Sequence, residues 1–495
     1  MNKSQKFNPD GVALRHGHFI NGRFVTPSAD GLLEIFRPSD FHSLGTLPEA
    51  SESTVDEAVA AARAAFRRNQ WGGLPPKERA NLLKRFASVL ANHGAELAEL
   101  EAVTSTRLLS ETRLREAKIA VDLLNYYAEY IDKIDGIVTP SETGSLSLIL
   151  NEPYGVVAGI VPWNFPMTGA MTKIAPALAA GNAVVLKPSE LTPFSALRIA
   201  ELASEAGLPD GVLNVVIGTG PVTGAALVKH PDVRKISFTG STATGARIMA
   251  DAAFSGNKPV TLELGGKSPV IVYSDVADLD AVAGHVTRGF LYNGGQVCTA
   301  GSRLIIDRKI KDALLDRIAE NIGKAVPGVT WQAETSLAPI ISQKQADRID
   351  SLVRKTVEEG AVLRVGGGRI ESINAGAYFQ PTILDGLETH MTGFREEFFG
   401  PVIAVQVFDD PEQAIDLADH PTYGLAASIF TNDMRKAMRA AKRLEAGTVW
   451  VNQHGRGPDL TSPGGGYKGS GFGKDWGRQG MDAYMHQKAV WINHG

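Results

Sequence analysis

The stretch AVVLKPSELTPFSALRIAELASEAGLPDGVLNVVIGTG, residues 183–220, decides the fold class of this chain. Its two apolar ends, Ala183–Leu186 and Leu213–Ile217, are short and rich in β-branched residues, which is typical of buried strands. Between them, Pro193–Ala206 has the apolar spacing of a helix. A strand, a helix and a second strand in this order predict a parallel βαβ unit.

The same alternation continues on both sides of this unit, from Tyr154 to about Val272. It predicts further strands at Gly155–Val161, Lys235–Phe238 and Val260–Leu262, and further helices at Gly169–Ala180, Pro221–Lys229 and Thr242–Ala252. Such a pattern is typical of a doubly wound, Rossmann-type parallel sheet, which binds its ligand at the carboxyl ends of the strands. A second αβ stretch runs from about Leu279 to Asn452, so the predicted fold class is α/β.

The region before this sheet predicts a hairpin and then helices. His18–Val25 places Asn21-Gly22 between two apolar runs, which is a strong hairpin signal. Residues 53–134 show helical apolar spacing, as in Val55–Arg67 and Lys77–Ala91. Because 495 residues exceed one ordinary hydrophobic core, we expect two or three domains.

Composition excludes several classes of protein. With 43% hydrophobic and 21% charged residues, the chain has the balance of a globular protein, and its formal charge of −4 provides no basic field for nucleic acid or anionic lipid. No apolar run has the length of a membrane span and Met1–Arg15 is polar, so a cytoplasmic location is expected. One cysteine forms no intrachain disulfide, and no Cys/His cluster has zinc-like spacing, so no metal is expected.

Two glycine-rich loops follow predicted strands and open predicted helices. Gly218–Gly224 has the spacing G-x-G-x-x-x-G, one residue longer than the usual dinucleotide motif, and is weak on its own. Gly240–Gly245 offers a helix N-terminus suited to a phosphate, although Ala246-Arg247 stand where a nucleotide-triphosphate loop needs Lys and Ser or Thr. For each loop alone, tight turns without a ligand remain an alternative.

Cys298 is the only cysteine, and that count alone favours a buried apolar residue. Its neighbours change this interpretation, because glycines before it allow the backbone to approach a ligand closely. Four segments occur in order: Pro162-Trp163-Asn164-Phe165-Pro166, Val260-Thr261-Leu262-Glu263-Leu264-Gly265-Gly266-Lys267, Gly294-Gly295-Gln296-Val297-Cys298 and Glu396-Glu397-Phe398-Phe399-Gly400-Pro401. Together with Leu186–Glu190, Phe238–Gly245 and Gly464–Gly473, the sequence resembles the aldehyde dehydrogenase superfamily over nearly its whole length.

The resemblance implies that Cys298 attacks the aldehyde carbon as a thiolate and forms a thiohemiacetal, so the site is expected to favour ionisation of the thiol. The oxyanion would be held by the Asn164 side chain and the backbone N–H of Cys298. Glu263 would activate the water that hydrolyses the resulting thioester, and its apolar strand end predicts a raised pKa. Relatives that transfer the acyl group to coenzyme A typically lack this glutamate. Asp475 either supports proton transfer or is a solvated loop charge.

The resemblance also implies a cofactor site. Lys187 and Glu190 would lie at the adenine ribose, and because Glu190 would repel a 2′-phosphate, NAD is predicted. Lys187 and Ser189 could still hold that phosphate, so NADP remains possible. Ser241 would meet the pyrophosphate, and Glu397 with Phe399 the nicotinamide ribose. The remaining predicted cofactor residues are Val161, Pro162, Trp163, Gly220, Gly224, Phe238, Gly240, Leu264 and Gly265.

Positions that are aromatic in relatives acting on acetaldehyde are small or polar here, namely Thr172 and Gly464. This predicts a widened entrance above an aromatic floor, suited to a bulky or aromatic aldehyde. His454 or Arg456 would meet a carboxylate or other polar tail. The other predicted wall residues are Phe165, Gly169, Tyr292 and Thr299.

The resemblance divides the chain into a cofactor domain, residues 1–133 and 153–262, a catalytic domain, 263–463, and an oligomerisation element, 134–152 and 464–495. Gly144–Leu150 alternates polar and apolar residues as an edge strand does, and Lys488–Asn493 is also predicted as a strand. Homodimers or homotetramers are expected. Alternatives are a semialdehyde or aminoaldehyde dehydrogenase, a member that uses NADP, and a catalytically inert dinucleotide-binding protein.

Overall fold

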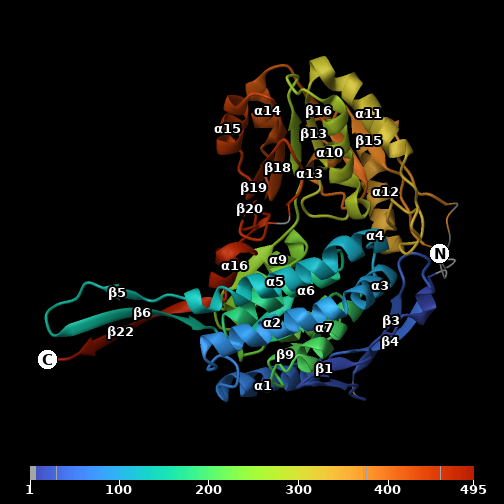
Figure 1. Cartoon of the computed structure of the whole chain (residues 1–495). Coiled ribbons are helices and arrows are strands. Elements are labelled where there is room, and N and C mark those ends of the chain that lie inside the picture. The colour runs from blue at the N-terminus through green and yellow to red at the C-terminus, as the bar shows by residue number, and fades with distance from the viewer. Residues whose placement is uncertain (1–6, 29, 372, 374–375, 458) are drawn as a thin grey trace, which may run out of the picture.

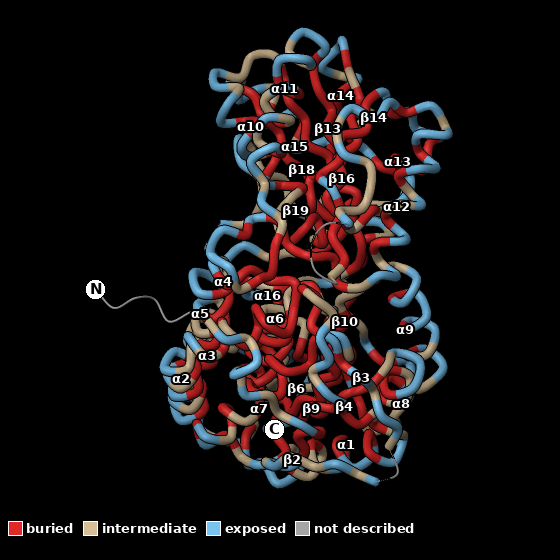
Figure 2. The backbone as a smooth tube through the Cα atoms, turned by 90° about the vertical axis from the view of Figure 1, so that its right-hand side faces the viewer, coloured by how far each residue is buried: buried red, intermediate tan, exposed pale blue. Residues whose placement is uncertain are grey.

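The computed structural model describes residues 7–28, 30–371, 373, 376–457 and 459–495. Figure 1 shows two large lobes stacked one above the other and a long arm that projects from the lower lobe. Figure 2 shows that the buried backbone runs through the interior of both lobes. No helix among the described residues is both long and apolar enough to cross a membrane.

An eight-stranded sheet forms the core of the lower lobe. Its order is β2 (Arg23–Val25), β1 (His18–Ile20), β9 (Leu213–Val215), β8 (Ala183–Lys187), β7 (Val156–Ile160), β10 (Val233–Thr239), β11 (Val260–Glu263) and β21 (Gly471–Phe472). Strands β7 to β11 are parallel, which confirms the predicted doubly wound sheet. Because β8 and β9 lie on one side of β7 whereas β10 and β11 lie on the other, the strand order reverses between β7 and β10. This is where such sheets bind ligands.

Helices cover both faces of this sheet. Residues of α1 (Glu52–Arg67), α8 (Ala225–Lys229) and α9 (Thr242–Phe254) pack with one face. Residues of α6 (Pro166–Ala179) and α7 (Phe194–Glu205) pack with the other, and α2 (Pro76–Asn92), α3 (Gly94–Thr104) and α5 (Ala117–Ala128) join the same core. The alternation of Val156 and Val157 between the two clusters is the two-residue period of a strand buried on both faces.

Most predicted elements are confirmed, with two differences. The Asn21-Gly22 turn joins β1 to β2 with positive φ at both residues, as the hairpin signal predicts. The predicted helix Pro221–Lys229 begins instead as a π-helical turn, Gly220–Gly224, before α8. A second hairpin, β3 (Gly31–Phe36) with β4 (Ser43–Glu49), was not predicted, because β3 is mostly exposed and carries no two-residue turn signal.

A seven-stranded sheet forms the core of the upper lobe. Its order is β14 (Val362–Val365), β15 (Thr382–Asp385), β16 (Val402–Phe408), β13 (Arg303–Asp307), β12 (Pro269–Val272), β18 (Ala426–Phe430) and β19 (Thr448–Val451). On one face it packs with α10 (Leu279–Leu291) and α11 (Lys311–Gly323), and on the other with α14 (Pro411–Ala418) and α15 (Met434–Arg443). This confirms the predicted second αβ stretch. Helix α12 (Gln343–Glu358) packs in a further apolar cluster.

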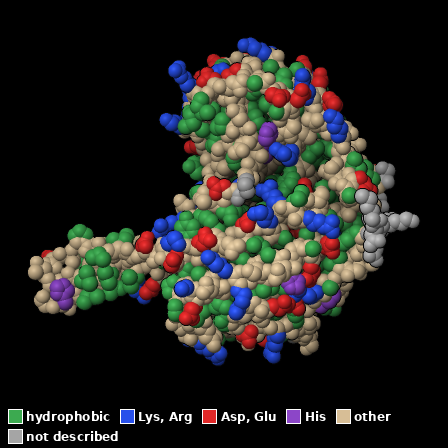
Figure 3. All heavy atoms as spheres, in the orientation of Figure 1, with side chains coloured by type: hydrophobic (Ala, Val, Ile, Leu, Met, Phe, Trp, Pro, Cys, Tyr) green, Lys and Arg blue, Asp and Glu red, His purple; other side chains and the backbone are tan. Residues whose placement is uncertain are grey.

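The arm is a three-stranded antiparallel sheet. β6 (Ser145–Pro153) lies between β5 (Ile137–Thr139) and β22 (Met485–Asn493), and it pairs with β22 from Met485↔Pro153 to Asn493↔Ser145. The two strands predicted in these segments are thus confirmed as strands. Figure 3 shows apolar side chains along the arm, in contrast to the charged side chains scattered over both lobes. Val138 and Trp491 are 67% and 69% exposed, so these side chains have no apolar cover within the chain.

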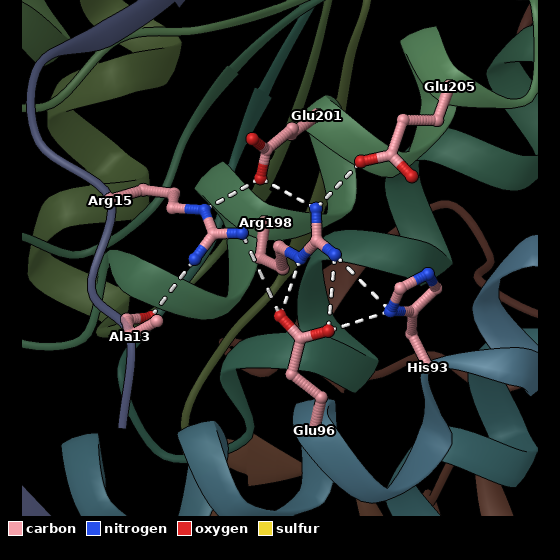
Figure 4. A network of polar contacts seen from close by, with 7 residues as sticks. All are labelled: Ala13, Arg15, His93, Glu96, Arg198, Glu201 and Glu205. Atoms are coloured by element: carbon pink, nitrogen blue, oxygen red, sulfur yellow. Dashed lines mark hydrogen bonds and ion pairs between the residues drawn. The ribbon is translucent and has the colours of Figure 1, made fainter. Parts of the chain in front are cut away.

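An ion-pair network holds the N-terminal segment and the outer helices against α7 (Figure 4). Arg198 on α7 donates from Nε to Glu96 Oε1 at 2.7 Å and from Nη1 to Glu201 Oε2 at 2.7 Å. Arg15 donates to the same Glu201 oxygen at 2.7 Å. The network therefore connects α3 and the N-terminal segment around Arg15 to α7, which packs on the eight-stranded sheet.

Candidate active site

The loop that presents Cys298 has a backbone that only glycine fits at one position. Asn293, Gly294 and Gly295 all have positive φ, and a Cβ on Gly295 would stand 2.1 Å from the carbonyl oxygen of Gly400. Likewise, a Cβ on Gly266 would stand 2.4 Å from the carbonyl oxygen of Cys298. The glycines of this motif therefore allow close packing of backbone against backbone.

Two amide side chains hold this loop. Gln296 donates from Nε2 to the carbonyls of Asn293 and Pro339 at 2.9 and 3.0 Å, and its Oε1 accepts from the N–H of Ile341 at 2.9 Å. Asn293 donates from Nδ2 to the carbonyl of Asn164 at 2.9 Å. No separate role was predicted for Asn293 or Gln296, because these contacts are with residues far along the chain.

Asn164 lies directly beside the nucleophile loop, as predicted. It follows β7, is 5% exposed, and donates from Nδ2 to the carbonyl of Gln296 at 2.9 Å. Since a primary amide carries two N–H groups, one donor remains beyond this bond. The structure thus brings Asn164 and Cys298 together at the carboxyl edge of the eight-stranded sheet.

The surroundings of Cys298 oppose ionisation of its thiol. Burial, together with the carboxylates of Glu397 and Glu263, raises its pKa to about 12. The expected stabilisation of a thiolate is therefore not provided by the protein alone, because both charged neighbours are anions. A cation or a general base must assist removal of the thiol proton.

Glu263 ends β11, and its side chain is sequestered with one oxygen unpartnered. Burial and the nearby Asp475 raise its pKa to about 8, which confirms the predicted direction. Its buried Oε1 has no hydrogen-bond partner and lies 3.0 Å from where a Cβ on Gly465 would stand. A carboxyl group with these properties is suited to general-base work near neutral pH.

Asp475 is buried, at 7% exposure, rather than a solvated loop charge. Lys173 on α6 donates from Nζ to its Oδ2 at 2.6 Å, and the backbones of Asp475 and Gly464 form a β-bridge. Lys173 was missed in the sequence, although a single lysine in the apolar stretch 169–180 was an available signal. The buried ion pair fixes Asp475 next to Glu263.

The predicted cofactor residues gather at the switch point. Lys187 ends β8, and its Nζ lies 3.0 Å from the carbonyl of Pro188 and 3.4 Å from Oε2 of Glu190. A lysine donor beside a carboxylate acceptor suits a ribose diol. Ser241 caps α9 by accepting from the N–H of Thr244 at 3.3 Å, so the helix N-terminus faces outward with Ser241 exposed.

Glycines shape this site through close packing. A Cβ on Gly240 would stand 2.4 Å from the Phe238 ring, and a Cβ on Gly245 would stand 2.6 Å from Leu264. Gly224, in contrast, lies 3.8 Å from the Lys187 side chain by the same measure, and Gly220 has open space. Val161, Pro162 and Ser189 lie in the segments that follow β7 and β8.

On the opposite side, Glu397 accepts from the N–H of Gly266 at 3.1 Å, and burial raises its pKa to about 7. A Cβ on Gly265 would stand 2.5 Å from its other oxygen. The rings of Trp163 and Phe399 meet edge to face at 5.4 Å, and Phe399 has a positive φ. These residues therefore form a connected wall between the two lobes. Together, the hydrogen-bonding groups of Lys187, Glu190, Ser241 and Glu397 match those that a dinucleotide presents.

On the substrate side, Phe165 and Tyr292 stack with ring centroids 6.0 Å apart. Arg107, which the sequence did not single out, lies with its Cζ 4.4 Å from one ring centroid and 4.5 Å from the other. Its Nη2 lies 3.0 Å from carboxylate oxygens of both Glu111 and Glu116. The aromatic pair is thus backed by a buried ionic cluster.

The other predicted substrate residues differ in what they contact. Thr172 donates to the carbonyl of Gly169 at 2.8 Å within α6, and Thr299 follows Cys298 directly. The ring of His454 lies against Gly289 and Gly301, with Nδ1 2.8 Å from the hydroxyl of Ser428. Burial lowers its pKa to about 4, so His454 is neutral and does not supply a cation for a carboxylate tail.

Arg456 occupies the space that glycine leaves at position 464. Its Nη2 lies 3.0 Å from where a Cβ on Gly464 would stand, its Cζ lies 5.2 Å from the Trp476 ring centroid, and its Nη1 donates to the carbonyl of Ser462. The entrance that the sequence predicted as widened is therefore lined there by a guanidinium group.

A doubly wound sheet with this site at its switch point defines an oxidoreductase of the dinucleotide-dependent α/β class. Comparison with known proteins agrees with that class. A family model, the aldehyde dehydrogenase family, matches residues 24–490. The chain is 39% identical to the NADP/NAD-dependent aldehyde dehydrogenase PuuC of Escherichia coli (strain K12), over 97% of this chain and 96% of PuuC. It is 40% identical to the phenylacetaldehyde dehydrogenase of Pseudomonas fluorescens, over 98% and 97%.

Solved structures give the same result. The aldehyde dehydrogenase KauB of Pseudomonas aeruginosa superimposes with a TM-score of 0.95 at 40% identity, covering 98% of both chains. The indole-3-acetaldehyde dehydrogenase AldA of P. syringae, solved with NAD+ and IAA, has a TM-score of 0.95 at 39% identity with the same coverage. This chain belongs to the aldehyde dehydrogenase family.

Proposed function

We propose that this protein oxidises an aldehyde to the carboxylic acid, with NAD as the hydride acceptor, through a thiohemiacetal and a thioester on Cys298. The observation that carries the proposal is the meeting of three groups from separate segments: the Cys298 loop, the Asn164 amide bonded to that loop, and the buried carboxyl of Glu263. An inert dinucleotide-binding protein has no need of all three.

The first step is attack by the Cys298 sulfur. A bond forms between Sγ and the aldehyde carbon, the thiol proton passes to water, and the carbonyl oxygen takes the negative charge. Burial and the neighbouring carboxylates raise the pKa of the thiol to about 12, so its ionisation has a free-energy cost in the protein alone. When bound, NAD supplies a positive nicotinamide ring that lowers this cost and then accepts the hydride.

The oxyanion accepts hydrogen bonds from the Asn164 amide and the Cys298 backbone N–H, which stabilise the tetrahedral intermediate. Loss of hydride from the former aldehyde carbon leaves a thioester. Ionised Glu263 then takes a proton from water, the hydroxide adds to the thioester carbon, and the C–S bond breaks to release the acid and regenerate the thiol. Asp475, held by Lys173, tunes the basicity of Glu263.

NAD is preferred because Glu190 would lie at the ribose 2′ position, where its charge repels a phosphate. On the substrate side, the stacked Phe165 and Tyr292 rings favour a bulky or aromatic aldehyde. The names of relatives span phenylacetaldehyde and aminoacetaldehyde substrates, so the family alone leaves this choice open.

Two variants test the mechanism by production of NADH. Cys298→Ala should abolish it, and turnover equal to wild type would exclude a covalent thiol mechanism. Glu263→Gln should form the thioester and then hydrolyse it slowly, which gives a burst of NADH equal to one equivalent per site followed by a slow phase. Loss of the burst together with turnover would contradict the assignment of Glu263 to the second half of the reaction.

The domain division expected from the sequence remains part of this proposal, with the arm as the oligomerisation element. Exposed apolar side chains on β5 and β22, including Val138 and Trp491, suit a contact between copies. Trp491→Lys should shift the mass measured by light scattering from dimer or tetramer to a smaller species. Gln487→Lys, at an exposed position on the same strand, is the control for an added positive charge alone.

A further inference from the structure

Three arginines from separate segments lie around the loop that carries His454 and Arg456. Arg115 lies in the π-helical turn Thr112–Glu116, and its Nη2 donates to the backbone carbonyl of Arg456 at 3.4 Å. Arg288 lies one helical turn before Tyr292 on α10. The loop that carries Arg456 packs against the same helix, because the ring of His454 contacts Gly289.

None of these three arginines has a carboxylate oxygen within 4.0 Å among the residues that the structure describes. Their polar partners are neutral: the Arg456 carbonyl for Arg115, the His285 ring for Arg288, and the Ser462 carbonyl for Arg456. Arg113, in the same turn as Arg115, instead pairs with Glu99 at 2.8 Å. Arg115, Arg288 and Arg456 thus keep donors that no carboxylate of the described residues takes up, whereas Arg113 does not.

The acidic residues nearby are already engaged. Glu111 and Glu116 both pair with the buried Arg107. Asp459 accepts from the backbone N–H and the hydroxyl of Thr461 at 2.8 and 2.7 Å. Oxygens of all three acids thus already have partners, whereas the three arginines keep donors that no carboxylate of the described residues takes up.

Arg456 is also preorganised for binding. Its guanidinium lies over the Trp476 ring, its Nη1 donates to the Ser462 carbonyl, and its Nη2 takes the place beside Gly464 that a side chain there would fill. Because Gly464 bridges to Asp475, the guanidinium lies on the same side of the site as the Glu263 carboxyl. Arginine presents donors in a planar fork that matches a carboxylate.

We infer that Arg115, Arg288 and Arg456 bind a carboxylate at the end of the aldehyde substrate remote from the reacting carbonyl. The inference rests on the proposed function and narrows it: the substrate is a bulky or aromatic aldehyde that carries a carboxylate. A substrate with an ammonium tail would be repelled by the same three cations. This distinguishes the site from one for aminoaldehydes.

The test compares benzaldehydes that differ only in the para substituent: carboxylate, hydrogen and trimethylammonium. At low ionic strength, we expect kcat/KM for 4-carboxybenzaldehyde to exceed that for benzaldehyde at least tenfold, and the ammonium compound to be the poorest. Arg456→Gln should lower the ratio of the first two values about tenfold, mainly through KM. Arg115→Gln and Arg288→Gln, at exposed positions, should each lower it severalfold. Arg113→Gln is the matched control and should leave the ratio unchanged.

A second measurement needs no turnover. Calorimetry with Cys298→Ala should show binding of terephthalate that weakens when Arg456→Gln is added and when salt is raised. Equal ratios in wild type and all three arginine variants, or preference for the ammonium compound, would overturn the inference. Failure of the proposed function has a different signature, namely undiminished NADH production by Cys298→Ala.

Discussion

The buried carboxyl pair of Glu263 and Asp475 makes a specific prediction for the variant Asp475→Asn. Burial and the Asp475 charge, in that order, raise the pKa of Glu263 to about 8. A like charge near a carboxyl raises its pKa by roughly 1 to 3 units, and removing this one also leaves the Lys173 cation unpaired nearby. Both changes favour ionised Glu263, so its pKa should fall by at least about 1 unit, or about 1.4 kcal/mol.

The sign follows from the proposed role of Glu263 as a base. Thioester hydrolysis needs the ionised form, so the rate falls about tenfold per pH unit below the pKa. In wild type the acid limb of kcat should bend near pH 8 where hydrolysis limits turnover, and in Asp475→Asn it should bend near pH 7 or below. At pH 7 the ionised fraction then rises from about one tenth to about one half.

The assay is stopped-flow NADH release across the pH range, which separates the burst from the steady rate. Breaking a buried ion pair costs about 3 to 5 kcal/mol of stability, so melting temperatures accompany each variant. The control is the double variant Lys173→Met/Asp475→Asn, which removes both charges and leaves burial as the main cause of the shift. An acid limb that stays in place in Asp475→Asn, or moves to higher pH, would refute the coupling of the two carboxyls.

Three further predictions concern other parts of the molecule. Asn164→Ala should lower kcat by about 10²- to 10³-fold, because it removes one oxyanion donor; a smaller loss than tenfold would argue against that role. Glu190→Gln should raise the ratio of kcat/KM for NADP to that for NAD, and an unchanged ratio would place the 2′ position elsewhere. In the network of Figure 4, burial raises the pKa of Glu96, but hydrogen bonds from Arg198 and His93 lower it by more. The pKa of Glu96 therefore lies below its usual 4.5. Its stabilising contribution is present above about pH 4.5 and is lost as pH falls through the folded pKa, so Arg198→Met should flatten the acid loss of melting temperature.

The parallel sheet was predictable because its signal is local. Strands such as Ala183–Leu186 are buried on both faces, so they form continuous apolar runs that stand out from the helices between them. The β3–β4 hairpin was not predictable in this way, since β3 has an exposed Leu32 and an exposed Phe36 and no regular alternation. A strand was therefore predictable from burial on both faces, as in β8, or from alternation of polar and apolar residues, as in β6, and β3 shows neither.

The candidate site residues also divide into those with a local sequence signal and those without one. Cys298, Asn164 and Glu263 lie within contiguous motifs, whereas Lys173 and Arg107 act through partners 302 and 9 residues away and belong to no motif. A buried charge needs a partner, so a lone lysine in an apolar helix was a clue that something acidic lies opposite. The identity of that partner, Asp475, required the folded chain.

Position 464 shows why an absent side chain is the hardest feature to interpret. The glycine predicted an open entrance, on the reasoning that a missing ring leaves empty space. Protein interiors and clefts are closely packed, however, so space that one residue vacates is commonly filled by another. Here the guanidinium of Arg456 fills it, 3.0 Å from the missing Cβ. The same glycine thus changes the entrance from apolar to cationic, which is a larger change in specificity than widening, because a buried or half-buried charge discriminates between tails of opposite sign.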